Sequence, residues 1–343
     1  MAVIEFAFDP VARAGIVAAR WETLAIAGAV LVALLLAAWL ARRTPIDSEA
    51  DTYAGILGPG QADHLRRDDL LFLVLGAVPG AVVGGRLGYA LLHADFYRAN
   101  PGALLEPGQG SLELVGAVLG GSVTAALVGA LLEAPVSRWF HVAAIPLLVA
   151  LAMGKAAQAL GGSGQGALLD APWATAYAGA GPWGSLGADL PAHPAQLYEA
   201  SSTLLALFLV IAMAAFGAFH RRDGRAFAVA VALWALGRGL ASLAWRDAPV
   251  LGPANAGTLL AAFAVVMALI MLLVAPRLAR EPRRKGLEVE PELHLRHESR
   301  LLHRSQHLAA AARRVGRLPC RAPVLDCARM RSQRRRLRAL SVR

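Results

Sequence analysis

Seven stretches of mainly apolar residues, each long enough to cross a lipid bilayer, constrain this chain more than any other feature of its sequence. A membrane helix needs about 20 such residues. With 57% hydrophobic residues among 343, the chain is too apolar for a soluble domain, so we predict an all-α, polytopic membrane protein with seven transmembrane helices. The stretches cover residues 23–41, 70–93, 111–133, 139–161, 196–219, 226–245 and 256–275.

The distribution of basic residues predicts the orientation of these helices. Arginines occupy the connections at 42–67 and 221–225 and the C-terminal tail, which all fall on one side of a seven-helix protein. The long loop at 162–195 contains no Lys or Arg and falls on the other side. Because basic loops stay in the cytoplasm, we expect the N-terminus outside the cell and the C-terminus in the cytoplasm.

The chain is therefore expected to divide into an outward segment at 1–22, a membrane domain at 23–276 and a basic tail at 277–343. The tail holds 19 of the 34 Lys and Arg residues and 6 of the 24 Asp and Glu residues, so it carries +13 and the rest carries −3. We expect it to be disordered or bound to anionic lipid of the inner leaflet; nucleic acid is the less favoured partner. The only cysteines, Cys320 and Cys327, lie in this tail, so a thiol in any membrane-embedded reaction must arrive with a substrate.

The stretch at 70–93 has two different faces. Its glycines recur every four residues and should let a neighbouring backbone approach closely, as should Gly116 and Gly120 in the next stretch. Arg86 and Tyr89 lie on the opposite side of a helix with about 3.6 residues per turn. We interpret one face as a packing surface and the other as functional. The recurring glycines are Gly76, Gly80, Gly84 and Gly88.

Three cations, Arg86, Lys155 and Arg238, are each expected about 10 Å inside the outer end of a different helix, at about 1.5 Å per residue. One interpretation is that each side chain extends separately to the lipid headgroups. However, an intramembrane cation costs about 2.5–3.5 kcal/mol, and only one clear carboxylate, Glu199, faces the three, with Glu113 nearer the surface. The excess of positive charge favours a buried site for an anionic, lipid-like substrate whose phosphate the cations bind.

Polar residues also cluster at the outer end of the fifth stretch, where residues 193–199 read His-Pro-Ala-Gln-Leu-Tyr-Glu. Such a run inside a membrane indicates residues that bind or react. Gln158 lies three residues after Lys155, hence on the same helical face. Its carboxamide can donate to an ester or phosphate oxygen, or it can bridge two helices, and both interpretations remain open.

Three motifs occur in order along the apolar stretches: Gly84-Gly85-Arg86-Leu87-Gly88-Tyr89, the run at 193–199, and Gly237-Arg238 followed eight residues later by Arg246. Together they resemble the prolipoprotein diacylglyceryl transferase family. The resemblance extends over residues 20–246, about two thirds of the chain, and the run at 193–199 is its most specific part. Members of that family move diacylglycerol from phosphatidylglycerol to the lipobox cysteine of a bacterial prolipoprotein.

The chain departs from the family pattern at several positions. The histidine of the family's His-Gly-Gly is replaced by Val115. The signature Arg-x-Gly-Asn reads Lys155-Ala156-Ala157-Gln158, although Gly166 matches its final glycine. Lys155 keeps the positive charge and Gln158 keeps the amide of the family residues, but Lys cannot form the bidentate hydrogen bonds of Arg. The other departures are Glu22, Gly161, Ser163 and Ser242, where the family has Tyr, Asn, Glu and Glu.

The resemblance implies a multi-pass enzyme of the bacterial plasma membrane that needs no cofactor and no metal. Its implied partners are phosphatidylglycerol and the signal peptides of prolipoproteins. Arg238 and Lys155 would stabilise the leaving phosphate, and Arg86 would hold either the headgroup region or the helix frame. Gln196 and Tyr198 would orient the substrate or bridge helices. The implied substrate-binding residues are Arg86, Tyr89, Gln158, Gly166, Gln196, Tyr198 and Arg246.

The base that takes the thiol proton is left open by the resemblance. With Val115 in place of histidine, His193 and Glu199 are the candidates, acting on a thiol whose ordinary pKa is near ~8.5. The alternative for His193 is a purely structural role at the helix entry before Pro194. The alternative for Glu199, which we favour, is an ion pair with Lys155 or Arg238.

Two classes of function are consistent with these residues. The first is the lipid-to-protein transferase. The second is a catalytically inactive or repurposed relative that binds an anionic lipid or solute in the membrane. A transporter usually has broken helices in two symmetric halves, whereas the polar residues here gather in one half of the membrane without an internal repeat.

Overall fold

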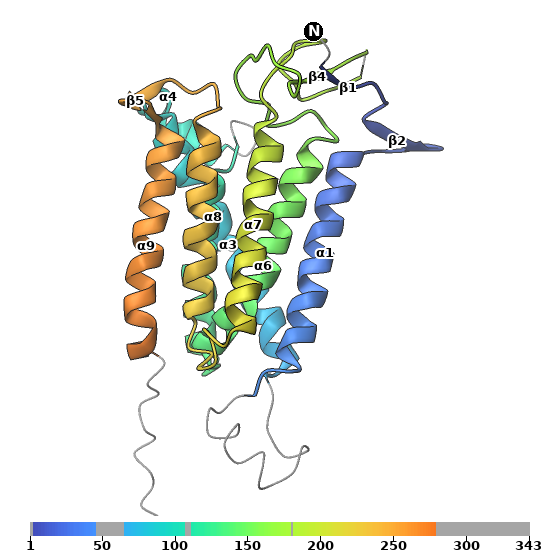
Figure 1. Cartoon of the computed structure of the whole chain (residues 1–343). Helices are drawn as coiled ribbons and strands as arrows, with labels where there is room; N and C mark the ends of the chain where they lie inside the picture. The colour runs from blue at the N-terminus through green and yellow to red at the C-terminus, as the bar shows by residue number, and fades with distance from the viewer. Residues whose placement is uncertain (1–2, 46–64, 107–110, 180, 279–343) are drawn as a thin grey trace, which may run out of the picture. The chain divides into compact units, whose positions relative to one another are not determined.

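The computed structural model describes residues 3–45, 65–106, 111–179 and 181–278, and these ranges contain seven helices that are long and apolar enough to cross a membrane (Figure 1). Each overlaps one predicted stretch, so the chain is a mostly helical, polytopic membrane protein. The tail beyond residue 278 lies outside the described residues. The helices are α1 (Trp21–Ala41), α3 (Arg67–Leu92), α5 (Leu114–Leu131), α6 (Val136–Gln158), α7 (Ala195–Ala215), α8 (Arg225–Ser242) and α9 (Ala256–Leu278).

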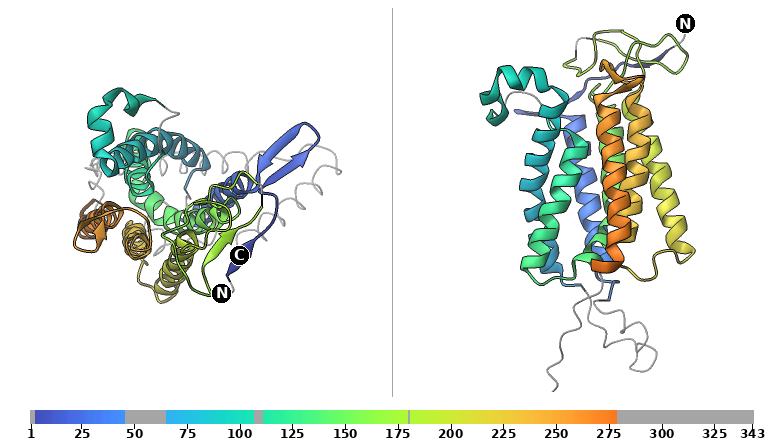
Figure 2. Two further views of the ribbon diagram at one scale, coloured as in Figure 1. Left: turned by 90° about the horizontal axis from the view of Figure 1, so that it is seen from above. Right: turned by 90° about the vertical axis from the view of Figure 1, so that its left-hand side faces the viewer.

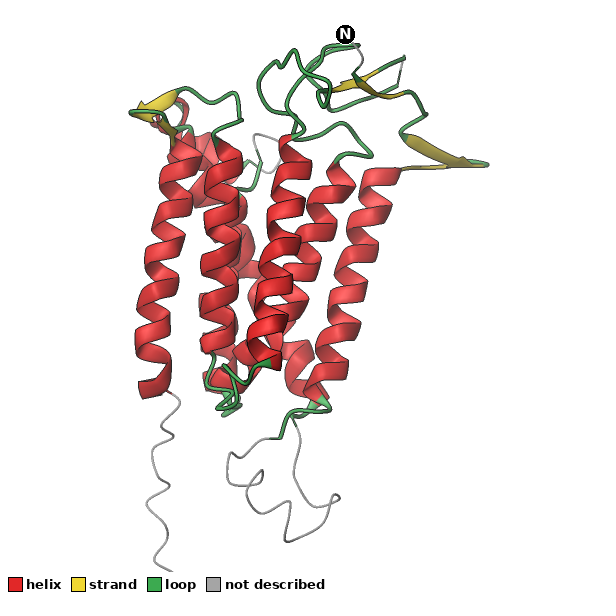
Figure 3. Cartoon of the chain, in the orientation of Figure 1, coloured by secondary structure: helices red, strands yellow, loops and turns green. Residues whose placement is uncertain are grey.

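The predicted all-α class holds for the bundle, but it did not include three short two-stranded sheets that form at one end of it (Figure 3). The strands have two to four residues, so they are too short to produce a readable alternation of apolar and polar residues. We call this end the strand end. β1 (Ile4–Phe6) pairs in parallel with β4 (Thr175–Tyr177), β2 (Val11–Ala14) pairs antiparallel with β3 (Val17–Arg20), and β5 (Pro249–Leu251) pairs antiparallel with β6 (Ala254–Asn255).

The two ends of the bundle are built differently. The strand end also carries α4 (Ala94–Ala99) and the 3-10 helix η1 (Pro101–Leu105), which follow α3. At the opposite end, the turns at 132–135 and 216–224 link α5 to α6 and α7 to α8 (Figures 1 and 2). Among the described residues, the long excursions of the backbone outside the helices therefore gather at the strand end.

The glycines of α3 pack against those of α5, as their four-residue spacing predicts. A Cβ atom placed on Gly84 would lie 2.2 Å from the carbonyl oxygen of Gly116, and one on Gly120 would lie 2.2 Å from that of Gly80. No larger residue fits at these contacts without a shift of the backbone. The two helices consequently meet backbone to backbone.

The apolar core lies mainly between α6, α7, α8 and α9. Leu148, Val210 and Trp234 are almost completely buried in it. By contrast, Leu91 on α3 and Phe208 on α7 are 70% and 67% exposed. Exposed large apolar side chains on the outside of a helical bundle are expected when lipid surrounds the bundle.

Candidate functional site

Arg238, one turn before the end of α8, lies among charged groups from three other elements. Its Nη1 donates to Oε2 of Glu199 on α7 at 2.7 Å, and its Nη2 donates to Oε1 of Glu113 at 2.9 Å. Nζ of Lys155 on α6 lies 3.1 Å from the same Glu199 oxygen. The side chains of Arg238, Glu199 and Glu113 are only 5%, 1% and 3% exposed. We call these four residues the charge cluster; its hydrogen bonds are of the strong, charge-assisted kind.

Glu113 reaches Arg238 because it is the N-cap of α5. Its Oε2 accepts a hydrogen bond from the backbone N–H of Gly116 at 2.7 Å, which satisfies one of the free donors at the start of that helix. Its own backbone N–H donates to the carbonyl of Gly85 at 2.8 Å. The carboxylate is therefore fixed by the start of α5 on one side and by α3 on the other.

Trp245, just after α8, covers the cations of the charge cluster. The centre of its ring lies 4.7 Å from the guanidinium carbon of Arg238 and 5.9 Å from Nζ of Lys155. Both contacts are within the range in which a cation is attracted to an aromatic face. The ring thus adds an apolar wall to the site without displacing either ion pair.

The charge cluster is balanced, so the predicted excess of cations is wrong. It contains two cations and two carboxylates, because Glu113 lies at the level of Arg238 rather than nearer the surface and because Arg86 points elsewhere. An unpaired charge in a dry interior costs several kcal/mol, so paired charges are the stable arrangement before any ligand binds. The alternative in which Glu199 pairs with a cation is confirmed, with both Lys155 and Arg238 as partners.

Arg86 binds the backbone of η1 rather than the charge cluster. Its Nε donates to the carbonyl of Leu104 at 2.9 Å, and its Nη2 donates to those of Ala103 and Glu106 at 2.6 and 2.8 Å. The guanidinium also lies over the ring of Tyr97, 5.6 Å from its centre. These contacts hold the segment after α3 against that helix.

Tyr89 belongs to the same neighbourhood as Arg86. Its ring stacks on His93 with centres 4.1 Å apart and meets Tyr97 edge-on at 6.3 Å. The structure therefore separates the sequence-predicted residues into two groups, one at the charge cluster and one at the end of α3. Glu113 connects them, since its backbone bonds to Gly85 one residue before Arg86.

Two glutamines lie about one helical turn nearer the strand end than the charge cluster. Gln158 follows Lys155 by three residues on α6, and Gln196 precedes Glu199 by three residues on α7. A Cβ atom on Gly164 would lie 3.0 Å from Oε1 of Gln158 and 3.3 Å from Cβ of Gln196. Both glutamines therefore border the same glycine of the loop after α6.

Tyr177 of β4 holds Gln196 in place. Its hydroxyl donates to the carbonyl of Ala159 at 2.9 Å and accepts a hydrogen bond from Nε2 of Gln196 at 3.2 Å. The ring is completely buried between Phe6 and Trp183, each centred 5.0 Å away. Burial raises the pKa of Tyr177 to about 12, so the hydroxyl keeps its proton at physiological pH.

His193 and Tyr198 lie beside each other at the start of α7. Nδ1 of His193 is 3.3 Å from the hydroxyl of Tyr198. The backbone N–H of Gly166 donates to the carbonyl of His193 at 2.8 Å. A Cβ atom on Gly166 would lie 2.1 Å from the carbonyl oxygen of Ala244, so glycine is required where this loop passes between α7 and the end of α8.

The remaining positions at which the chain departs from the family pattern have structural partners of their own. Val115 is completely buried in the core. Ser242 shares a 2.7 Å hydrogen bond with Thr258 of α9, and Ser163 donates to Oε2 of Glu22 at 3.0 Å. Arg246 lies in the loop after α8 with an exposed side chain, outside the charge cluster.

Sequence reasoning did not assign three residues to the site: Glu113, Tyr177 and Trp245. The signal for Glu113 is its place immediately before an apolar stretch, where an N-cap residue is expected. Tyr177 and Trp245 were visible only as aromatic residues near the membrane surface, which usually serve as anchors. Their contacts to Gln196 and Arg238 depend on how distant segments fold together.

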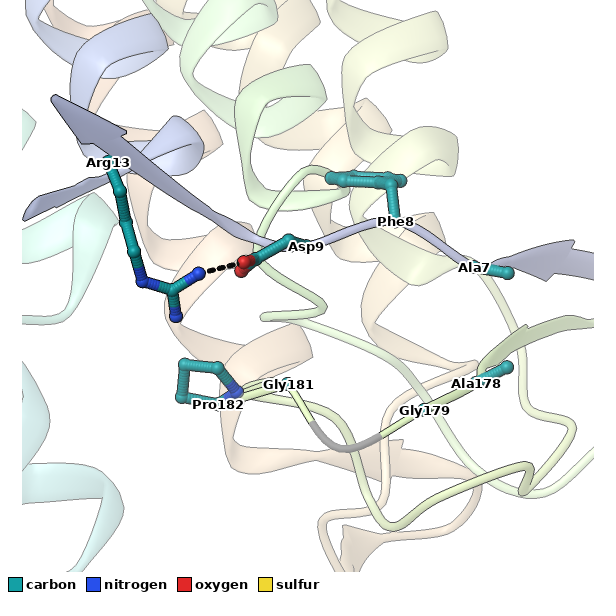
Figure 4. Close-up of a pocket in the computed structure, with 8 residues that line it drawn as sticks. All are labelled: Ala7, Phe8, Asp9, Arg13, Ala178, Gly179, Gly181 and Pro182. Carbon is teal, nitrogen blue, oxygen red and sulfur yellow. Dashed lines mark hydrogen bonds and ion pairs between the residues drawn. The ribbon is translucent and has the colours of Figure 1, made fainter.

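A shallow hollow at the strand end lies apart from this site. Figure 4 shows it between the segment around Phe8 and the loop that contains Pro182. Asp9 and Arg13, its charged lining residues, pair with each other, and both side chains are about half exposed or more. A solvent-exposed pair of this kind interacts weakly, and the candidate site is therefore the charge cluster with the neighbouring glutamines.

Comparison with known proteins identifies one family model and several relatives that are similar to this chain. A family model described as prolipoprotein diacylglyceryl transferase matches residues 10–274, a range that includes the whole charge cluster. A relative from Nitrobacter hamburgensis is 30% identical over 276 residues, which cover 78% of this chain and 88% of the relative. A relative from Rhodopseudomonas palustris is 28% identical over 67% of this chain and 76% of its own length. Both are described as phosphatidylglycerol–prolipoprotein diacylglyceryl transferases.

Proposed function

The chain belongs to the prolipoprotein diacylglyceryl transferase family, and from this membership we infer that it transfers the diacylglyceryl group of phosphatidylglycerol to a cysteine thiol of a prolipoprotein. In this reaction the thiolate sulfur attacks the glyceryl carbon that carries the phosphate. A carbon–sulfur bond forms, the carbon–oxygen bond to phosphate breaks, and glycerol phosphate leaves with the electron pair. The thiol proton passes to a base. The thiol comes from the substrate, because both cysteines of this chain lie in its tail.

The buried position of Arg238 between two carboxylates, with Lys155 beside it, is the observation that carries this proposal. The leaving phosphate gains negative charge in the transition state, and fixed cations in a dry site stabilise it. We assign Arg238 and Lys155 to this task. Glu199 binds both cations through one oxygen and keeps their spacing, while Trp245 excludes water from them.

We assign His193 as the base. Oε2 of Glu199 is engaged by both cations, whereas the His193 ring lies at the entry of α7 beside Tyr198. In the proposed tautomer, Nδ1–H of His193 donates to the Tyr198 hydroxyl, which leaves Nε2 free to accept the thiol proton. Tyr198 therefore orients the base.

The other predicted residues surround this centre in the proposal. Arg86 keeps η1 against α3, Tyr89 contacts Tyr97 of α4, and both residues so support the headgroup side of the site. Gly166 brings the loop after α6 against His193. Arg246, exposed at the strand end, attracts the anionic headgroup before it enters.

The proposed location is the bacterial plasma membrane, with the strand end facing outward and the C-terminus in the cytoplasm. The loop at 162–195, which has no Lys or Arg, belongs to the strand end, whereas the arginines at 221–225 belong to the opposite end. The positive-inside rule supports this orientation. The signal peptide of the prolipoprotein then meets the site from the outer half of the membrane, and the basic tail meets anionic lipid of the inner leaflet.

A catalytically inactive relative that binds an anionic lipid is the second candidate. The observation that favours it is Val115, which stands where the family has histidine and is completely buried in the core. In that case the charge cluster would bind phosphate without any transfer to a thiol.

Complementation tests the proposed function. The chain is expressed in a bacterium depleted of its own diacylglyceryl transferase, and lipidation of a reporter prolipoprotein is followed by its shift in gel mobility. We expect the wild type to restore lipidation and Arg238→Ala to abolish it. Arg98→Ala is the matched control, because Arg98 on α4 is 78% exposed and lies outside the site.

A purified assay separates the two candidate functions. The protein in detergent is mixed with phosphatidylglycerol and a lipobox peptide, and both the thioether product and lipid binding are measured. Binding without product, from a protein that inserts and folds normally, would establish the inactive relative. Product formation that requires Arg238 would establish the transferase.

A further inference from the structure

Three buried oxygens near the charge cluster have no hydrogen-bond donor among the described residues. They are Oε1 of Gln158, Oε1 of Gln196 and Oε1 of Glu199. Gln196 and Glu199 are each only 1% exposed. Buried acceptors in folded proteins nearly always receive a hydrogen bond, and one that does not is costly. Three such oxygens in one neighbourhood indicate a partner that supplies donors.

The direction of the Gln196 amide is set by its neighbours. The Tyr177 hydroxyl has one proton, and it donates that proton to the carbonyl of Ala159. Toward Gln196 it can therefore only accept, so the amide nitrogen faces Tyr177 and the amide oxygen faces away from it. Because the raised pKa keeps Tyr177 protonated, this arrangement persists across the pH range of an ordinary assay.

The residues that carry the three oxygens are neighbours in the fold. Gln158 and Gln196 border Gly164 from two different helices. Glu199 follows Gln196 by three residues, on the same face of α7, and its other oxygen holds Lys155 at 3.1 Å. The two glutamines are thus about one helical turn, roughly 5 Å, from the cations along their helices, whereas the Glu199 carboxylate lies beside the cations.

We propose that Gln158, Gln196 and Glu199 form a subsite that accepts hydrogen bonds from the free hydroxyls of the phospholipid's glycerol headgroup. The proposal rests on the proposed function and adds the group that is recognised. The leaving group of that reaction has a phosphate, which needs cations, joined through a three-carbon chain to two hydroxyls, which need acceptors. The charge cluster supplies the first and the unpaired oxygens supply the second, at a separation that a glycerol phosphate spans.

Such a subsite makes the protein selective for its lipid. A phospholipid with the same charge but no headgroup hydroxyls would leave all three acceptors unpaired in a buried site, whereas the two hydroxyls of glycerol can pair two of them. Sites built to bind a hydroxyl reject analogues that lack it much more strongly than apolar pockets reject a change of size. The cations alone cannot make this distinction, since both lipids carry the same phosphate.

The test compares two lipids with identical acyl chains, phosphatidylglycerol and phosphatidylpropanol, as donors to a lipobox peptide. The purified full-length protein is assayed for kcat/KM with each. We expect the wild type to prefer phosphatidylglycerol by about 10- to 100-fold. Gln196→Leu and Gln158→Leu should each reduce this preference at least several-fold, mainly by lowering kcat/KM for phosphatidylglycerol.

Gln165→Leu is the matched control. Gln165 is also a buried glutamine of the strand end, but both ends of its amide have partners: Nε2 donates to the carbonyl of Thr175 at 2.8 Å, and Oε1 accepts from the N–H of Leu186 at 3.3 Å. The variant should keep the wild-type ratio between the two lipids even if its activity falls. The ratio also corrects for differences in the folded fraction among variants.

The outcomes separate this proposal from the one it rests on. If the wild type transfers from neither lipid, the proposed function fails. If it transfers from both equally well, or if Gln158→Leu and Gln196→Leu change both rates by the same factor as Gln165→Leu, the transferase stands and the hydroxyl subsite is refuted. A preference that depends on Gln158 and Gln196 but not on Gln165 supports it.

Discussion

The guanidinium of Arg238 and the carboxylate of Glu113 come from positions 125 residues apart in the chain and lie 2.9 Å apart in the fold. Glu113 is at the same time the N-cap of α5. One carboxylate therefore starts a helix and neutralises the central cation of the site. A change at Glu113 should affect both stability and activity.

Replacing Glu113 with Gln should lower both. If the amide oxygen keeps the cap hydrogen bond to Gly116, the amide nitrogen faces Nη2 of Arg238, so two donors meet and the cation loses a partner. Breaking a buried ion pair by removing one member costs about 3–5 kcal/mol. We expect a clear fall in the melting temperature in detergent and at least a tenfold lower kcat/KM. Glu5→Gln, at an exposed position in β1, is the control, and equal melting curves for the two variants would contradict this role.

Gly84→Ala should destabilise the pair of helices α3 and α5. Its methyl group would lie 2.2 Å from the carbonyl oxygen of Gly116, and relieving such overpacking typically costs about 1–3 kcal/mol. The matched control is Gly28→Ala in α1, where the added Cβ meets nothing within 4 Å. Thermal unfolding in detergent should show a lower midpoint for Gly84→Ala only. A midpoint for Gly84→Ala as high as that of the control would mean that the helices can separate freely.

Arg86→Lys should behave like Arg86→Ala. The ammonium group of Lys cannot reproduce the hydrogen bonds from the planar guanidinium to the carbonyls of Ala103, Leu104 and Glu106. Positive charge alone should therefore not restore the stability lost in the variant. We expect both variants to unfold at lower temperature, by the loss of about 1–3 kcal/mol. If Arg86→Lys instead kept full stability and raised only KM, a direct contact with the lipid phosphate would replace the structural role proposed here. Arg98→Lys on exposed α4 serves as the reference.

Tyr177→Phe should relax the choice between lipids. Without the hydroxyl, the amide of Gln196 loses the acceptor that fixes its direction, and the preference for phosphatidylglycerol over phosphatidylpropanol should fall several-fold. The same variant gives a pH test. Because the folded-state pKa of Tyr177 is raised to about 12 from an ordinary value near 10, its contribution to stability is complete below pH ~10 and declines as pH rises toward 12. Unfolding midpoints should therefore fall less steeply over this interval in Tyr177→Phe than in the wild type.

The helices were predictable because length and apolarity report directly on membrane spans. The α3–α5 contact was predictable too, since glycine at four-residue spacing has a local meaning that does not depend on the rest of the fold. The ion pairs of Glu199 were also among the predicted alternatives, because a carboxylate deep in a membrane requires a cation. Lys155 and Arg238 were the nearest candidates.

The arrangement of the site depended on information that the sequence does not express locally. Equal depths on separate helices do not fix which helices are neighbours, so Arg86 was grouped with Lys155 and Arg238 although it binds η1. Whether Glu113 reaches Arg238 depends on where α5 begins relative to α8. The bond between Tyr177 and Gln196 depends on the position of β4, which pairs with β1 about half the chain away and forms a bridge with Ala192 just before α7.

The pairing of β1 with β4 also determines an order of assembly. Ile4 to Phe6 leave the ribosome before their partners, Thr175 to Tyr177, which follow only after α1, α3, α5 and α6. The first strand must therefore wait, unpaired, while the helices in between are synthesised and inserted. Only when it pairs does Phe6 stack on Tyr177, whose hydroxyl directs the amide of Gln196. A chain arrested before residue 175 would have four of the seven long helices, an unpaired first strand, and neither Gln196 nor Glu199 of the proposed subsite.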